Sequence, residues 1–181
     1  MSPYKIRHAR IEDHPALQAL ITRSARVLSQ GDYTAQQIEL ALAGTYGVDS
    51  KLISDRTYFV AEDEGGIIGC GGWSRRATLF GGDAVREEKS GDDNLLDPKI
   101  SAARIRAFFI DPPHARKGIG RALLSRCEEE ALVAGFTTFE LVATIPGVRL
   151  YAACGYAPGE RFQHDMNGVK IDFVPMSKFV T

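Results

Sequence analysis

The sequence has few cysteines and no long apolar run. Its 181 residues include only three cysteines, Cys70, Cys127 and Cys154, and no two of them form a Cys-x-x-Cys pair. Three widely separated cysteines predict reduced thiols packed as small core residues. No segment approaches the about 18 consecutive apolar residues that cross a membrane, and the first residues contain no apolar targeting stretch. We therefore expect a cytoplasmic protein without a membrane-spanning segment.

The sequence also lacks an excess of charge and a metal-binding pattern. Its net charge is −1 and its basic residues are scattered, so neither a nucleic acid nor an anionic membrane surface is expected as a partner. The four histidines, His8, His14, His114 and His164, share no ligand spacing, and we expect no metal site. A hydrophobic content of 44% is typical of a soluble protein, and the length suits one domain, 1–181.

Hydrophobic periodicity and turn residues predict an alternation of strands and helices. Asp13 and Thr34 stand where the N-caps of two helices are expected, and Asn167-Gly168 marks a hairpin turn. Hairpins near both ends of the chain with a β-α-β crossover between them predict a mixed α/β sheet. In chain order we expect a strand at 4–10, helices at 14–29 and 35–43, strands at 57–61, 67–73 and 103–111, a helix at 118–134, a strand at 136–144, a short helix at 147–154, and strands at 161–166 and 169–174.

A long segment, 77–100, shows no sustained hydrophobic period. Such segments are either functional flaps or disordered insertions, and the sequence leaves both interpretations open. Six acids against three bases give the segment a net charge of −3, which hints at a cationic acceptor such as a polyamine or a lysine or amino-terminal amine. These charged residues are Asp83, Glu87, Glu88, Asp92, Asp93 and Asp97, with Arg86, Lys89 and Lys99.

A glycine-containing turn joins the predicted strand 103–111 to the predicted helix 118–134. Gly118 and Gly120 allow a ligand to approach the backbone closely, because neither carries a side chain. The first N–H groups of a helix have no internal partner, and with the positive end of the helix dipole they form an anion site. Arg116, Lys117 and Arg121 place positive charge around the same point. This arrangement favours a diphosphate.

The spacing separates this turn from two common phosphate-binding loops. A Walker loop carries its lysine after the second glycine, whereas Lys117 precedes both glycines here. The dinucleotide fingerprint requires a third glycine at position 123, which is Leu123. The alternative is that Gly118 and Gly120 only make a tight turn, and the preceding strand and the three cations favour a ligand site over it.

Two segments of the chain resemble the GNAT superfamily of N-acetyltransferases. The family pattern Gln/Arg-x-x-Gly-x-Gly/Ala, after a strand that ends in aliphatic-x-Pro, is matched by Ile110-Asp111-Pro112 and Gly118-Ile119-Gly120, although Ala115 occupies the Gln/Arg position. Leu150-Tyr151-Ala152-Ala153-Cys154-Gly155-Tyr156 is similar to the family's Leu-Tyr-x-x-x-Gly-Phe segment. The resemblance implies a single domain with a central, mostly antiparallel sheet, a splayed parallel strand pair and flanking helices.

The resemblance further implies direct transfer of an acetyl group from acetyl-CoA to a small-molecule or peptide amine. The N–H of Ile110 is then the expected donor to the thioester oxygen, and Tyr151 the general acid that protonates the leaving thiolate. The expected coenzyme-binding residues are Phe108, Phe109 and Ile110, which pair with the pantetheine arm, and Ala115, Arg116, Lys117, Gly118, Ile119, Gly120, Arg121 and Tyr151.

The sequence leaves the general base open among Glu140, His114 and Asp97. An ammonium of pKa near 10 must lose a proton before it attacks, directly or through water. We expect the acceptor site to be lined by Tyr33, Trp73, Arg75 and the 77–100 loop, since aromatic side chains with polar tips hold ligands well.

Two other hypotheses stay open. A non-catalytic acyl-CoA-binding or regulatory module would keep the fold and the coenzyme site, and Ala115 is the departure from the family pattern that allows it. The edge strands of the C-terminal hairpin could pair across a homodimer.

Overall fold

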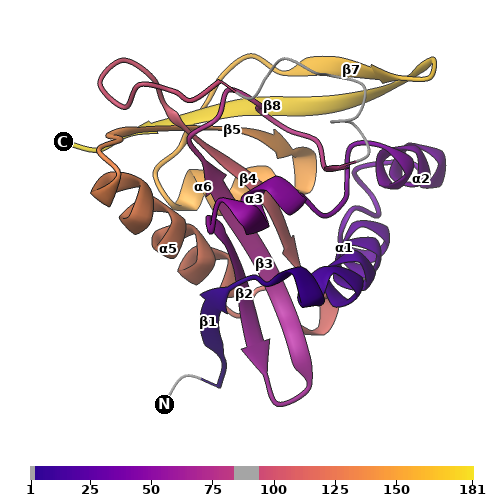
Figure 1. Ribbon diagram of the computed structural model, residues 1–181. Helices are drawn as coiled ribbons and strands as arrows, with labels where there is room; N and C mark the ends of the chain where they lie inside the picture. Colours follow the sequence, from indigo (N-terminus) through magenta and orange to yellow (C-terminus); the bar gives the residue numbers. More distant parts are fainter. Residues whose placement is uncertain (1–2, 84–93) are drawn as a thin grey trace.

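One mixed β-sheet organises the chain in the computed structural model, which describes residues 3–83 and 94–181. Among these residues, eight strands follow the order β1-β2-β3-β4-β5-β8-β6, and β7 pairs with β8 (Figure 1). The strands are β1 (Lys5–His8), β2 (Tyr58–Asp63), β3 (Gly66–Ser74), β4 (Ala103–Ile110), β5 (Thr138–Thr144), β6 (Ala157–Pro158), β7 (Phe162–Met166) and β8 (Val169–Phe179). The predicted mixed α/β class is confirmed.

The sheet is antiparallel except between β4 and β5, which run parallel. These two strands pair only at Ala103↔Phe139 and Arg104↔Glu140, although both continue well beyond these positions. The expected splayed pair is therefore present, and it leaves a gap in the middle of the sheet.

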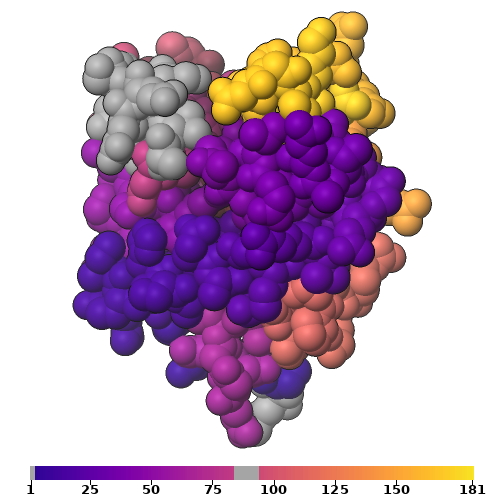
Figure 2. All heavy atoms as spheres, turned by 90° about the vertical axis from the view of Figure 1, so that its right-hand side faces the viewer, coloured from indigo at the N-terminus to yellow at the C-terminus, as the bar shows by residue number. Residues whose placement is uncertain are grey.

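Helices cover both faces of the sheet. They are α1 (His14–Leu28), α2 (Ala35–Ala43), α3 (Ser50–Ser54), α5 (Ile119–Val133) and α6 (Val148–Ala153), with 3₁₀ turns η1 (Ile11–Asp13), η2 (Pro112–His114) and η3 (Ile145–Gly147). One hydrophobic cluster joins the sheet to α1, α2 and α3, and a second joins it to α5 and α6. Figure 2 shows the face where α1 and α2 lie between the yellow C-terminal hairpin and the magenta β2–β3 turn.

Burial explains most of the predicted elements. On α1, Leu17, Leu20 and Ile21 are fully buried, as their spacing predicts.

Thr34 caps α2, because its side chain accepts from the N–H of Gln37 at 3.1 Å while the Gln37 side chain accepts from the N–H of Thr34. Of the cysteines, Cys70 and Cys127 are buried and Cys154 is half-buried, and all three are free thiols.

Several features differ from the sequence expectation, among them the two-residue strand β6, which was not predicted. Asp13 does not cap α1, because its carboxylate is taken by Arg7 and by the N–H of Arg10. The short helix α3 was not predicted, and Asp49 caps it. β8 continues past Val174 through Pro175, which has no N–H to donate. The carbonyl of Pro175 accepts from the N–H of Gly159, on the edge of β8 that faces away from β5. Because the N–H and the carbonyl of one strand residue face the same edge, the missing N–H of Pro175 removes no hydrogen bond to β5.

The middle of the 77–100 segment lies outside the described residues, with Arg86, Glu87, Glu88, Lys89, Asp92 and Asp93 in it. Two hydrogen bonds join residues 75–77 to residues 94–96. The N–H of Leu96 donates to the carbonyl of Arg75 at 2.7 Å, and the N–H of Ala77 donates to the carbonyl of Asn94 at 3.2 Å. Within the described ranges, no helix is long and apolar enough to span a membrane.

An ionic cluster fixes the start of α1 against the sheet. The guanidinium of Arg7 binds Asp13 at 2.7 Å and Glu62 at 3.0 Å, which links β1, η1 and β2. These hydrogen bonds lower the pKa of Glu62 from 4.5 to about 2, and the Arg7 bond also lowers the pKa of Asp13.

This cluster predicts a specific loss of stability in acid. Because the pKa of Glu62 is lower in the folded state, its stabilisation is complete above about pH 4.5 and disappears as the pH falls through about 2. The Arg7→Met variant should lose part of the pH dependence of its urea midpoint in this window. An identical pH dependence in both proteins would contradict the assignment.

Candidate active site

A cavity of about 540 Å³ runs through the gap between β4 and β5. On one face of the sheet its walls are α1, the segments 45–47 and 79–82, and Phe173 of β8. On the other face they are the turn before α5, the start of α5, and α6. Residues 105–110 of β4 line the cavity, so this one strand borders the cavity on both faces of the sheet.

A bulge in β4 shapes the centre of the cavity. Cys70 of β3 lies opposite Phe109 and Gly72 lies opposite Arg106, so β4 contains one more residue than its partner over this stretch. The extra residue is Ala107, whose φ of 58° is in the left-handed region. Its carbonyl accepts from the hydroxyl of Tyr58 at 3.3 Å, which holds the bulge from the buried side.

The bulge and the splay leave backbone groups of β4 facing the gap. The N–H of Asp111 donates to the carbonyl of Ile68 on β3, at 2.9 Å. Successive N–H groups of a regular strand point to opposite edges, so the N–H group of Ile110 faces β5. Because β5 does not pair with this part of β4, this group is available to a peptide-like ligand.

The turn before α5 presents its backbone outward. Arg116 and Gly118 have φ of 66° and 84°, and α5 begins at Ile119. No side chain caps the helix, and its first bond joins the N–H of Ala122 to the carbonyl of Gly118 at 3.0 Å. Among the described residues, the amides at the mouth of α5 are therefore uncapped, and with the helix dipole they make this end of the helix suitable for an anion.

The two glycines of this turn have different roles. A Cβ on Gly118 would meet nothing within 4 Å, so this position faces open space. A Cβ on Gly120 would lie 3.0 Å from Leu150, so this glycine allows α5 to pack closely against α6. The sequence alone could not distinguish these two roles, because glycines at both positions fit a phosphate-binding turn.

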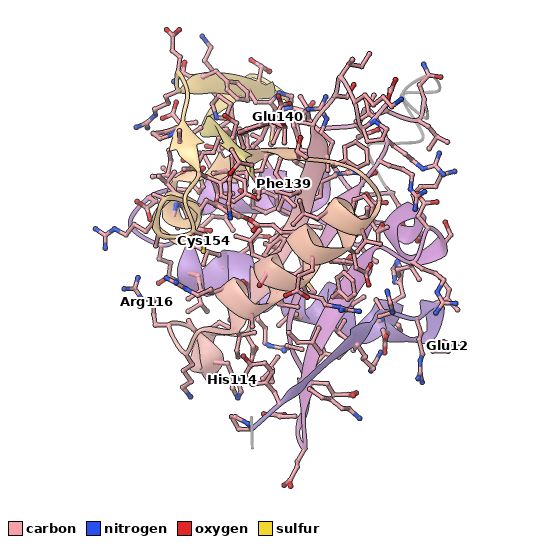
Figure 3. The ribbon with its side chains drawn as sticks, turned by 90° about the vertical axis from the view of Figure 1, so that its left-hand side faces the viewer. Glu12, His114, Arg116, Phe139, Glu140 and Cys154 are labelled. Atoms are coloured by element: carbon pink, nitrogen blue, oxygen red, sulfur yellow. The ribbon has the colours of Figure 1, made fainter. Side chains whose placement is uncertain are left out.

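Basic side chains surround the mouth of α5. Arg116 and Arg121 line the cavity, as does Arg149 of α6, which the sequence analysis did not single out. Lys117 is exposed and is not among the lining residues. In Figure 3, Arg116 points outward, above His114 at the same corner of the molecule.

Tyr151 lies on the cavity wall and is 8% exposed. Its ring meets Phe108 edge-on at 6.1 Å and Tyr156 at 5.9 Å, which fixes its orientation. Burial raises the pKa of Tyr151 well above its ordinary value, so the phenol keeps its proton at neutral pH.

The three candidate bases lie in different places. Glu140 pairs with Arg104 where β4 and β5 are still joined, and Figure 3 shows it at the opposite end of the molecule from His114. Asp97 is exposed, and neither acid lines the cavity. His114 does line it, but its ring lies between Asp111 at 3.2 Å and Asp63 at 3.4 Å, beside the anion site.

Tyr33, Trp73 and Arg75, which were expected to bind the acceptor, do not line the cavity, whereas residues 79–82 of the 77–100 loop do. Tyr33 is buried, and its hydroxyl donates to the carbonyl of Asp172 at 2.6 Å and accepts from the N–H of Ile145 at 3.0 Å. Trp73 is 2% exposed and packs against Phe136, and Arg75 lies over its ring at 5.7 Å. All three have structural contacts instead, which an aromatic or basic residue in a sequence does not reveal.

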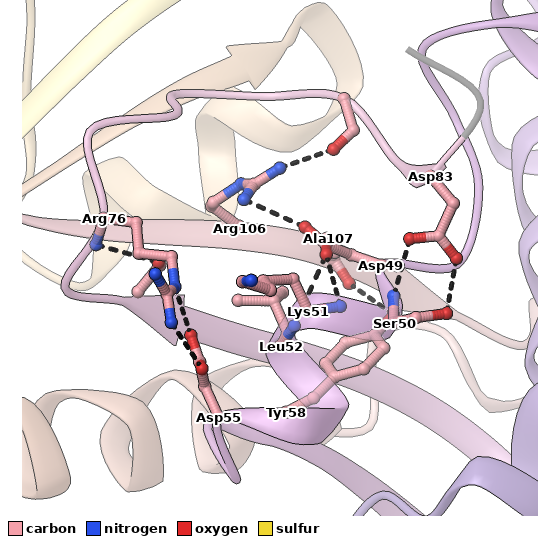
Figure 4. Close-up of polar contacts among 12 residues, drawn as sticks. Asp49, Ser50, Lys51, Leu52, Asp55, Tyr58, Arg76, Asp83, Arg106 and Ala107 are labelled. Carbon is pink, nitrogen blue, oxygen red and sulfur yellow. Dashed lines mark hydrogen bonds and ion pairs between the residues drawn. The ribbon is translucent and has the colours of Figure 1, made fainter. Parts of the chain in front are cut away.

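A buried ion pair supports the segment 79–82. The guanidinium of Arg106 binds the carboxylate of Asp49 at 2.9 Å, and both side chains are almost fully buried. Arg106 also donates to the carbonyl of Gly81 (Figure 4). Asp83, next in the chain, accepts from the N–H of Ser50 at 2.8 Å. The segment is therefore held by the start of α3 and by β4.

A sequence profile described as the acetyltransferase (GNAT) domain matches residues 54–158, more than half of the chain. The protein therefore belongs to the GNAT acetyltransferase family. Curated proteins give no significant match in sequence.

Solved structures share the fold at low identity. The GCN5-related N-acetyltransferase from Rhodopseudomonas palustris is 19% identical, with a TM-score of 0.69 over 99% of this chain and 98% of its own. PaiA N-acetyltransferase from Thermoplasma acidophilum, solved with coenzyme A, is 19% identical, with a TM-score of 0.65 over 99% of each chain. YncA from Salmonella typhimurium, solved with acetyl-CoA, is 17% identical, with a TM-score of 0.63 over 99% of this chain and 95% of its own.

The buried ion pair gives a stability prediction. Arg106→Met should lower the free energy of unfolding by about 3–5 kcal/mol, because it removes the guanidinium that binds the buried carboxylate of Asp49. Adding Asp49→Asn should recover most of this loss, because the amide is neutral and still caps α3. Urea unfolding at pH 7 measures both, and a double variant as unstable as the single one would contradict the ion-pair assignment.

Proposed function

We propose that the protein is an N-acetyltransferase that moves an acetyl group from acetyl-CoA to a primary amine by direct attack on the thioester. The observation that carries this proposal is the uncapped mouth of α5 beside the open gap between β4 and β5. A diphosphate and a peptide-like arm are the two chemical features of coenzyme A that these two sites suit.

The coenzyme is proposed to bind along the β4 side of the cavity. The N–H groups of 119–121 hold the diphosphate, with Arg116, Arg121 and Arg149 around it. The pantetheine arm pairs with the backbone of 108–110, in the place that β5 leaves free. PaiA with coenzyme A and YncA with acetyl-CoA, which share the fold, support this choice of ligand.

In the proposed reaction, the amine nitrogen attacks the thioester carbon and forms a C–N bond. The negative charge that develops on the carbonyl oxygen is stabilised by the N–H of Ile110. Collapse of this intermediate breaks the C–S bond, and Tyr151 donates its proton to the departing thiolate. Water takes up the proton that the attacking nitrogen loses, and solvent returns a proton to Tyr151. The phenol can act as the donor because it carries its proton at neutral pH and lies on the cavity wall.

The segment 79–82 is proposed to be the described part of an acceptor flap. Leu79, Phe80, Gly81 and Gly82 all line the cavity, on the face opposite the anion site. Of the two interpretations of the 77–100 loop, a functional flap is the one that this position favours.

The first test uses two glycines with the same backbone geometry. Gly118 and Gly168 have φ of 84° and 83°, and a Cβ at either meets nothing within 4 Å. Aspartate at either position should therefore cost a similar amount of stability, about 1–2 kcal/mol. Only Gly118→Asp should weaken acetyl-CoA binding, by roughly a thousandfold, because like charges about 4 Å apart near a protein surface repel by about 4 kcal/mol.

Isothermal titration calorimetry with acetyl-CoA measures both variants. Equal affinities of Gly118→Asp and Gly168→Asp for acetyl-CoA would contradict a diphosphate site at the mouth of α5. Gly120→Asp is a poorer test, since its side chain would collide with Leu150 and disturb the fold.

The second test removes the proposed proton donor. Tyr151→Phe keeps the ring contacts with Phe108 and Tyr156 and should lower turnover by roughly a hundredfold or more, with coenzyme affinity unchanged. Release of free coenzyme thiol measures turnover with a panel of amines. Unchanged turnover would exclude Tyr151 as the acid. Tight coenzyme binding without thiol release from any amine in the wild type would favour the non-catalytic module.

A further inference from the structure

The acceptor half of the cavity is lined by aromatic rings. Tyr46, Phe80, Phe109 and Phe173 contribute to it, and they come from four separate parts of the chain. Phe80 stacks on Phe173 with ring centroids 6.1 Å apart and planes at 27°, and Tyr46 meets Phe109 edge-on at 5.7 Å. We name these four residues the aromatic chamber. Such a surface binds flat or bulky apolar groups through burial and ring contacts.

The charge of the cavity does not suit a polycation. Within the described part of the chain, no lining side chain is a carboxylate, whereas several are arginines. On the acceptor side the charged residue is Arg106, whose guanidinium is bound to Asp49. The net negative charge of the 77–100 segment hinted at a cationic acceptor, but its two described acids, Asp83 and Asp97, lie outside the lining.

Tyr46 adds a polar group to this apolar surface. The residue is 7% exposed and its ring lines the cavity. Its hydroxyl is shielded from solvent and makes no hydrogen bond to any of the residues that the structure describes. A buried hydroxyl without a partner is unfavourable, so a ligand polar group that pairs with it would gain affinity.

The apolar chamber also bears on the protonation of the amine. Removal of an ammonium group from water disfavours its charged form and lowers its pKa. An amine placed beside the aromatic chamber therefore loses its proton more readily than in solution. This effect supplies neutral amine without a carboxylate base among the described lining residues.

We propose that the acceptor is an arylalkylamine: a primary amine whose aromatic body fills the chamber and whose polar ring substituent reaches the hydroxyl of Tyr46. This inference rests on the proposed acetyltransferase function and specifies its substrate class. The amine chain extends toward the thioester at β4, and Phe80 and Tyr46 determine specificity.

A panel of acceptors tests the substrate class. Thiol release from acetyl-CoA is measured with tyramine, 2-phenylethylamine, 3-methylbutylamine, spermidine and a lysine-containing peptide. We expect kcat/KM for tyramine to exceed that for spermidine or the peptide by at least tenfold. Acetylation of spermidine or the peptide as fast as tyramine would overturn the inference and leave the proposed function intact. Thiol release from no amine would count against the proposed function itself.

Two matched phenylalanines test the chamber. The rings of Phe80 and Phe162 both lie 6.1 Å from that of Phe173, but only Phe80 lines the cavity. Phe80→Ala should lower kcat/KM for tyramine about tenfold, mainly through KM, with acetyl-CoA affinity unchanged by calorimetry. Phe162→Ala should leave both values close to wild type. Equal effects of the two variants on KM would show that Phe80 acts only through packing.

The hydroxyl of Tyr46 is tested with two acceptors that differ by one oxygen. Tyr46→Phe should raise KM for tyramine about three- to tenfold and change that for 2-phenylethylamine little, because only tyramine offers a partner to the hydroxyl. The variant should fold at least as stably as the wild type, because the lost hydroxyl has no protein partner among the described residues. Equal changes in KM for both acceptors would show that the hydroxyl of Tyr46 does not recognise the polar substituent of the ring.

Discussion

The separation of β4 from β5 is the constraint on which the rest of the structure depends. The two strands are joined at Arg104 and Glu140 and then diverge, and the bulge at Ala107 turns the free stretch of β4 toward the gap. A parallel pair with unpaired backbone groups is costly in a folded core unless something else pairs with them. The unpaired stretch of β4 therefore suits an extended, amide-containing ligand. The uncapped start of α5 lies next to this stretch.

The sequence indicated the coenzyme half of the proposed site more fully than the acceptor half. The turn before α5 is contiguous, so the spacing of Gly118 and Gly120 and the flanking cations already indicated an anion site. The divergence of β4 and β5 was expected only from the family resemblance, because no local pattern encodes missing strand pairing. Tyr46 and Phe80 carry no local signal, since the chamber forms only when distant segments meet.

The places where the structure departs from expectation have the same physical origin. Tyr33 and Trp73 were expected at the acceptor site because they are large and amphipathic, but these properties also suit a buried position. Trp73 packs with Phe136 under α5, and the carboxylate of Asp13 is drawn from its helix to Arg7. In each case a tertiary partner that is remote in sequence decides what the side chain does. Thr34, whose partner lies three residues away, was predicted correctly.

The hydroxyl of Tyr33 has a consequence beyond the burial of one ring. It joins the carbonyl of Asp172, next to the chamber residue Phe173, to the N–H of Ile145, where η3 begins and leads into the helix that carries Tyr151. One oxygen atom thus ties the wall around the acceptor to the segment that positions the proposed proton donor. β8 also pairs directly with β5 at Phe173↔Thr144, so this hydroxyl and the sheet together hold the chamber wall beside the segment that leads into α6.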